Sequence, residues 1–120
     1  MKKILILGGG TAGTMVANHI SKKFPSSDVS VTVVDRDIWH YYQPGFLFIP
    51  FGIYNKERVR KKIHHFLPKN VCLLHKEVAT IEGHDNKVKC ADGETISYDY
   101  LIIATGCRID QEETPGMLDA

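Results

Sequence analysis

The sequence has few cysteines and no residue spacing typical of a metal site. Its three cysteines, Cys72, Cys90 and Cys107, lie far apart without a C-x-x-C pair, which argues against a disulfide framework and a common zinc site. We expect Cys72 and Cys90, which fall in strand-like segments, to be small core residues. The six histidines show no H-E-x-x-H spacing, and His64 and His65 would point in different directions on a helix. The sequence therefore predicts no metal site.

An excess of charge and a long apolar segment are also missing. Fifteen basic and 14 acidic residues leave a net charge of +1, which gives no electrostatic basis for binding nucleic acid and no polybasic membrane patch. The first apolar run breaks at Gly8, too early for a signal peptide, and the longest run, 46–53, contains a proline and a glycine. We therefore expect a cytoplasmic or peripheral membrane location, with no signal peptide or transmembrane segment in this chain.

A glycine-rich turn follows the first apolar run, residues 4–7, which is typical of a strand buried on both faces of a parallel sheet. Gly8, Gly10 and Gly13 have the G-x-G-x-x-G spacing. In that fingerprint the first glycine allows a tight turn and the second lets a phosphate approach the backbone. The third lets the following helix pack closely on the strand. The free N–H groups at the start of that helix suit a pyrophosphate.

The residues after the turn complete a strand–helix–strand pattern. A second strand, 29–34, ends at Asp35, 22 positions after Gly13, where the fingerprint expects an acid for the ribose hydroxyls of an adenosine. The alternative is a glycine-rich turn in an unrelated α/β protein, with Asp35 a solvated strand end. The helix between the strands is predicted from Thr11 to about Lys23, and its apolar face is predicted to contain Ala12, Met15, Val16, His19 and Ile20.

Residues 36–56 form an unusually aromatic stretch. Seven of the eleven aromatic residues lie between Trp39 and Tyr54, and the prolines and glycines among them exclude a long helix or a central strand. Such an apolar loop needs a cover, so it can be buried against a larger protein, line a flat ligand, or do both. After it we predict a helix from Asn55 to about Phe66, with one apolar and one basic face.

The second half of the chain adds strands of two kinds. Residues 71–74 form a short apolar strand, and period-two patterning predicts an antiparallel meander at about 76–98 with a hairpin turn at Asp92-Gly93. A buried strand, 101–104, then closes on a small Thr105-Gly106 turn. The fold class is therefore α/β: a Rossmann-like parallel sheet with helices and an inserted antiparallel β-meander.

Taken in this order, the segments resemble the first FAD-binding domain of the flavoproteins that carry two dinucleotide-binding domains, among them the pyridine nucleotide-disulfide oxidoreductases. Residues 39–52, W-H-Y-Y-Q-P-G-F-L-F-I-P-F-G, resemble sulfide:quinone oxidoreductases more specifically. In that family sulfide reduces the flavin through reactive cysteines, and the flavin then reduces a membrane quinone. The resemblance implies FAD as the cofactor.

The resemblance also implies a role for each matching residue. The pyrophosphate would be held by Gly8, Gly10, Thr11, Ala12 and Gly13, and the adenosine ribose by Asp35. The flavin would be bordered by Tyr42, Gln43 and Pro44, and the adenine would contact Val78. The segment that closes over the cofactor would be Ala104, Thr105 and Gly106.

Members of that family run to several hundred residues, and their essential cysteines are expected beyond residue 120. We interpret residues 1–106 as the N-terminal part of the FAD-binding domain and 107–120 as a polar tail leading into a missing remainder. The chain alone is then expected to be inactive, with Cys107 its one candidate for a reactive thiol. Sulfide and quinone would be partners of the parent protein, and membrane contact would come only from the missing C-terminal region. The uncovered aromatic loop would favour self-association.

Two alternatives to this function stay open. The first is another flavoenzyme, either a flavocytochrome sulfide dehydrogenase subunit or a type II NADH dehydrogenase. The aromatic stretch contains no cysteine, which weakens the case for a covalent flavin there. The second alternative is of another class, a non-catalytic nucleotide-binding Rossmann module.

Overall fold

The computed structural model describes residues 1–119 and contains one α-helix, nine strands and five short 3₁₀ turns in that range. The helix is α1, Thr11–Lys23. The strands are β1 Lys2–Leu7, β2 Val29–Asp35, β3 Trp39–Tyr41, β4 Arg60–Lys62, β5 Val71–His75, β6 Val78–Glu82, β7 Lys87–Cys90, β8 Thr95–Ser97 and β9 Tyr100–Ile103. The 3₁₀ turns are η1 Gln43–Phe48, η2 Ile63–Phe66, η3 Gly83–Asp85, η4 Gln111–Glu113 and η5 Met117–Asp119.

Four of the strands form a parallel sheet in the order β5-β2-β1-β9. Strand β1 is central, because Ile4 is paired with Val31 on one side and with Tyr100 on the other. Its apolar residues, Leu5 to Leu7, are almost fully buried, as expected for a strand covered on both faces. The chain runs outwards from β1 to β2 and β5 and then returns to β9 on the opposite side. This reversal next to β1 is the position at which open α/β sheets bind ligands, outside the carboxyl ends of the strands.

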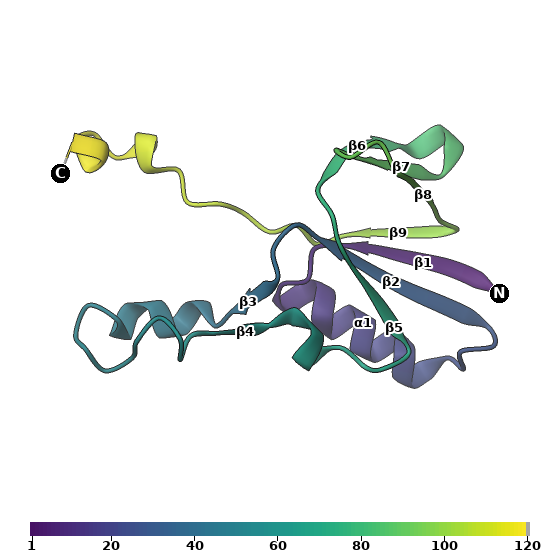
Figure 1. Ribbon diagram of the computed structural model, residues 1–120, viewed down its shortest axis with the longest axis horizontal. Coiled ribbons are helices and arrows are strands. Elements are labelled where there is room, and N and C mark those ends of the chain that lie inside the picture. The colour runs from purple at the N-terminus through teal and green to yellow at the C-terminus, as the bar shows by residue number, and fades with distance from the viewer. Residues whose placement is uncertain (120) are drawn as a thin grey trace.

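The two faces of the sheet are covered by different elements, α1 on one side and the meander β6-β7-β8 on the other (Figure 1). On the helix side, Ala17 packs with Ile6, Val31 and Val33. On the meander side, Val88 packs with Leu5, Leu7 and Val34. The predicted parallel sheet and inserted meander are therefore confirmed.

The predicted apolar face of α1 is wrong in part. Gly13, Thr14 and Ala17 are its buried residues, whereas Met15 is 66% exposed and Ala12 and His19 also face outwards. The helix lies so close to β1 that small side chains fill the interface. A prediction from hydrophobicity alone therefore identifies the face of α1 next to the one that is buried.

Residues 36–66 form an arm that projects from the sheet (Figure 1), and the helix predicted over 55–66 is wrong. Strand β4 instead pairs antiparallel with β3, with Trp39 opposite Lys62, and η2 follows directly. The guanidinium carbon of Arg60 lies over the Trp39 ring, 4.1 Å from the ring centroid. Val59 and Ile63 are buried, as the helical spacing required. Val59 does so from the turn before β4, next to Gly45, and Ile63 from η2, next to Gly9. The rings of His64 and His65 lie side by side, with their centroids 4.2 Å apart and their planes tilted by 38°, so the two side chains do not point in different directions.

The cysteines divide differently from the prediction. Cys90 is buried as expected, whereas Cys72 is exposed, as is Cys107. Cys72 lies on the edge strand β5, on the face that it shares with Leu74, outside the area that the meander covers. Within residues 1–119 no group of three or more side chains is arranged to hold a metal ion.

The molecule is elongated, with a radius of gyration of 16.7 Å, against about 14 Å for a compact chain of this length. The arm and the segment after β9 project to the same side (Figure 1). Residues 107–119 are exposed and contain η4 and η5, and residue 120 of the predicted tail lies outside the described residues. No helix within residues 1–119 has both the length and the apolar character needed to cross a bilayer.

Candidate functional site

The glycine turn after β1 is held between β2 and β9. Gly8 donates its N–H to the carbonyl of Val34 at 2.8 Å and has a φ of +103°, which side chains rarely tolerate. A Cβ on Gly8 would lie 2.2 Å from the carbonyl oxygen of Ala104. The predicted tight turn is therefore confirmed, and it brings the end of β9 directly against the turn.

The other two glycines of the fingerprint have opposite surroundings. A Cβ on Gly13 would lie 1.8 Å from the carbonyl oxygen of Gly8, which is a clash between two backbones. The close packing predicted for Gly13 is thus present. A Cβ on Gly10 would meet nothing within 4 Å among residues 1–119. Gly10 therefore faces open space at the start of α1.

The N-terminus of α1 offers unpaired hydrogen-bond donors. Gly10 is the N-cap and provides no side-chain cap, and the first turn contains no acidic residue. Within residues 1–119, no hydrogen bond is donated by the backbone N–H groups of Gly10, Thr11, Ala12 or Gly13. These donors and the helix dipole together suit an anionic group such as a phosphate.

Asp35 ends β2 beside the turn. Its Oδ2 accepts the Gly9 N–H at 2.6 Å and its Oδ1 accepts the Asp37 N–H at 2.8 Å. A carboxylate has about four acceptor positions in all, so capacity remains for the hydroxyls of a ribose. Asp35 thus fixes the turn and can still bind a ligand.

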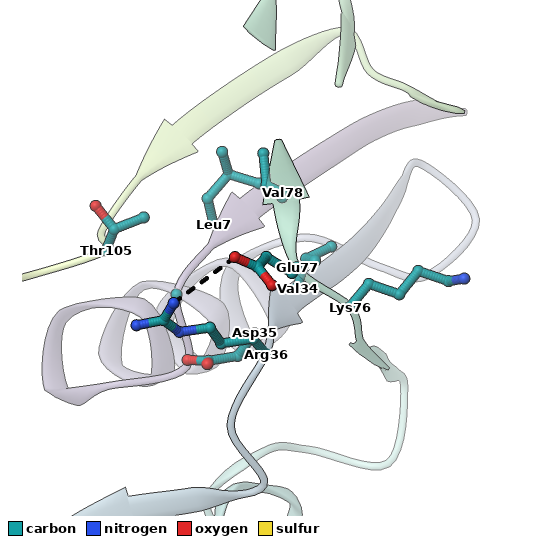
Figure 2. A pocket seen from close by; sticks show the side chains of 9 residues that line it. Leu7, Val34, Asp35, Arg36, Lys76, Glu77, Val78 and Thr105 are labelled. Atoms are coloured by element: carbon teal, nitrogen blue, oxygen red, sulfur yellow. Dashed lines mark ion pairs between the residues drawn. The ribbon is translucent and has the colours of Figure 1, made fainter. Parts of the chain in front are cut away.

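Two hollows meet at Asp35. The first, about 240 Å³, lies at the carboxyl ends of β1 and β2 (Figure 2). Its lining brings together four predicted residues, Gly8, Asp35, Val78 and Thr105, with five others, Leu7, Val34, Arg36, Lys76 and Glu77. The second, about 450 Å³, extends towards the arm. Its lining contains the predicted Gly8, Gly10, Thr11, Ala12, Asp35, Gln43, Ala104, Thr105, Gly106 and Cys107, and also Arg36, Asp37, Trp39, His40 and Tyr41.

Three predicted residues line neither hollow. Gly13 acts through packing, as its contact with Gly8 requires. Tyr42 and Pro44 lie on the arm outside both linings, and Tyr42 is 57% exposed. The flavin-border role predicted for Tyr42 and Pro44 stays a prediction.

Sequence reasoning missed several residues that line these hollows. Arg36 and Glu77 lie 3.7 Å apart across the first hollow (Figure 2). Both side chains are mostly exposed, so this ion pair is weak. Arg36 is therefore free to turn towards a ligand. Arg36 could have been found from its place directly after Asp35, and Glu77 from its place before Val78. Nothing in the local sequence singles out His40.

Lys76 belongs to the fold more than to the site. Its Nζ lies 2.5 Å from Asp92 and 2.7 Å from Glu94, and its side chain points away from Arg36 and Glu77 (Figure 2). These hydrogen bonds hold the pKa of Lys76 well above its usual range. The side chain therefore fastens the β7-β8 hairpin and is not available to a ligand.

Comparison with known proteins agrees with this geometry. Residues 2–120 match the family model described as pyridine nucleotide-disulphide oxidoreductase. The mitochondrial sulfide:quinone oxidoreductase of Schizosaccharomyces pombe is 33% identical over 132 residues, covering 98% of this chain and 29% of that protein. A type II NADH:quinone oxidoreductase of Staphylococcus haemolyticus is 26% identical, with 98% and 29% covered. The X-ray structure of the sulfide:quinone oxidoreductase from Aquifex aeolicus superposes with a TM-score of 0.81 at 24% identity, over 92% of this chain and 25% of that chain. The chain thus spans less than a third of these proteins.

Proposed function

This chain belongs to the pyridine nucleotide-disulphide oxidoreductase family, and on that premise we propose that it is the FAD-binding part of a flavoprotein that oxidises sulfide and reduces a membrane quinone. The observation that supports FAD as the cofactor is the uncapped start of α1 beside Asp35. Free amides for a pyrophosphate and a carboxylate for a ribose are the two groups that a dinucleotide needs.

The residues of this chain divide the binding of FAD among them. Gly10, Thr11 and Ala12 offer N–H groups to the pyrophosphate, and Asp35 accepts the ribose hydroxyls. The first hollow, between Val78 and Thr105, would take the adenine. The second hollow would take the flavin end, which accepts and passes on electrons when bound. Within this chain we assign the residues binding and orientation, and no catalytic step.

Similarity supports sulfide and quinone as the substrates of the whole protein, because the sulfide:quinone oxidoreductase of S. pombe matches almost all of this chain. A type II NADH:quinone oxidoreductase matches it almost as fully, so NADH oxidation is the second candidate. Both relatives are named for a quinone, and they differ in the electron donor, which is sulfide in one and NADH in the other. Because the chain covers only 29% of either protein, we assign no residue of this chain to binding of the electron donor, whether sulfide or NADH.

Binding of FAD to the 120-residue chain is the first test. Titration should show FAD binding, and NADP⁺ should bind far more weakly because its 2′-phosphate would face the Asp35 carboxylate. Asp35→Asn removes the charge and should narrow this difference. Equal or tighter binding of NADP⁺ by the unchanged chain would contradict the assignment of Asp35.

Activity is the second test. We expect no sulfide:quinone turnover from this chain, even with FAD added, because it corresponds to so small a part of its relatives. Quinone reduction above background at saturating sulfide would contradict this expectation. It would also make the exposed Cys107, which lines the second hollow, the thiol to examine.

A further inference from the structure

Both polar groups of Gly9, the middle residue of the glycine turn, are held by side chains from other elements. Its N–H donates to Asp35 Oδ2 at 2.6 Å. Its carbonyl oxygen lies 3.1 Å from Nδ1 of His40 on β3. A Cβ on Gly9 would lie 2.9 Å from Ile63 Cδ1, so the base of the arm also packs against the turn. Gly9 is therefore fixed in position from three sides.

Fixing the Gly9 carbonyl also fixes the next N–H group. The carbonyl of Gly9 and the N–H of Gly10 belong to one planar trans peptide, and in that plane they point in opposite directions. A carbonyl turned towards His40 therefore turns the Gly10 N–H away from it. That N–H is one of the unpaired donors at the start of α1.

We infer that His40 is a positioning residue of the dinucleotide site, which holds the Gly9–Gly10 peptide so that the Gly10 N–H is ready for a phosphate. This rests on the proposed function. The imidazole is itself held in place, with its ring centroid 4.4 Å from that of Phe66 on η2. Without this hold the peptide between two glycines has unusual rotational freedom. His40 thus gives the turn the rigidity that its own residues lack.

The contact dictates which nitrogen of His40 carries a proton. A carbonyl oxygen only accepts hydrogen bonds, so Nδ1 must be the donor. Neutral His40 is then the Nδ1–H tautomer, with Nε2 unprotonated and free to accept. This assignment follows from the partner, and ¹⁵N NMR of the imidazole measures it without any ligand.

Three variants of the 120-residue chain separate the hydrogen bond from the ring. His40→Phe keeps a ring against Phe66 but has no donor, and His40→Asn restores an N–H donor near Nδ1. His19→Phe is the matched control, because His19 is exposed on α1 outside the site. The ligands are FAD, ADP and adenosine. ADP shares the pyrophosphate of FAD, whereas adenosine reaches only the ribose and adenine positions.

We expect His40→Phe to weaken FAD and ADP about three- to tenfold, the range of one lost hydrogen bond, and to leave adenosine unchanged. His40→Asn should recover most of that loss, and His19→Phe should behave as the unchanged chain. Equal losses for ADP and adenosine, no loss in His40→Phe, or an Asn variant as weak as the Phe variant would overturn the inference.

The tautomer keeps the inference falsifiable where ligand binding fails. If the unchanged chain binds no FAD, the proposed function fails. The contact with Gly9 is still tested by two NMR measurements, the tautomer of His40 and the chemical shift of the Gly10 amide in the unchanged chain and in His40→Phe. An Nε2–H tautomer in the folded chain would refute the contact. If His40→Phe does not fold, His40→Leu, which also lacks a hydrogen-bond donor, takes its place beside His40→Asn. Equal ADP affinity in the Leu and Asn variants would then overturn the inference.

Discussion

Replacing Gly10 or Gly13 with alanine makes the same chemical change three residues apart, and the structure predicts opposite outcomes. The Cβ of Gly13→Ala would start 1.8 Å from the Gly8 carbonyl oxygen. Neither atom can rotate away from the other, so α1 and the Gly8 peptide must separate by more than an ångström. The Cβ of Gly10→Ala would meet nothing within 4 Å of the described residues, at an unstrained φ of −76°.

The magnitudes follow from competing terms. At Gly13, overpacking costs about 1–3 kcal/mol, and alanine recovers about 1 kcal/mol of helix propensity. Because the clash joins two backbones, we expect a net loss of about 1–2 kcal/mol, or a fall in Tm of roughly 4–8 °C. At Gly10, the poorer N-cap residue and the smaller entropy of the unfolded chain nearly cancel, leaving a change of about 0.5 kcal/mol or less.

Cofactor binding should show the reverse order. The Gly10→Ala methyl would project into the open space where the second hollow meets α1, so FAD affinity should fall by about tenfold or more. Thermal melts of the apo-proteins and FAD titrations measure the two effects separately. A Gly13→Ala variant as stable as the unchanged chain would refute the close approach of α1 and β1. A Gly10→Ala variant with unchanged FAD affinity would refute the pyrophosphate site.

Three further outcomes are expected. With a thiol reagent at pH 8, Cys72 and Cys107 should react at once and Cys90 only on unfolding, because burial raises the pKa of the Cys90 thiol; three fast thiols would contradict the fold of the meander. The Lys3 backbone N–H, at 2.7 Å, and Lys2 lower the pKa of Asp99. Asp99 therefore stabilises the fold above its unfolded pKa of about 3.9, and this contribution is lost as pH falls through the lower folded value. Asp99→Asn should lower Tm at pH 7, and the difference from the unchanged chain should shrink below about pH 4; a constant difference would exclude ionisation as its cause. Sedimentation should show that the chain self-associates, and Phe51→Ser should weaken this association because Phe51 is 74% exposed at the tip of the arm. A monomeric unchanged chain would contradict the expectation that the exposed aromatic arm drives self-association.

Local patterns were sufficient for the sheet, α1 and the meander, because each of these elements carries its own periodicity or turn residues. The arm was misjudged for the opposite reason. Val59 and Ile63 are spaced as on a helix, but Ile63 is buried against Gly9, more than fifty residues earlier in the chain. No window of sequence contains that contact.

The site shows the same limit. Gly8, Gly10, Gly13 and Asp35 could be predicted because the fingerprint places them at fixed intervals. His40 could not, because its partner is a backbone carbonyl whose direction depends on the finished turn. Cys72 was misplaced because its exposure depends on how far the meander extends over the sheet.

The contact between Gly8 and Ala104 also determines when the site can exist during folding. β1 has partners on both sides, but β9 is separated from it by almost the whole chain. During synthesis, residues 1–35 are free to fold while β1 still presents an unpaired apolar edge, the kind of edge that promotes aggregation. Such distant pairings form slowly, since a long loop must close first. Pairing of β9 therefore gives β1 its second neighbour and brings Ala104 and Thr105 to the glycine turn in one step. A ligand that bridges the glycine turn and Thr105 would bind only after β9 has paired with β1, and would hold β9 in place.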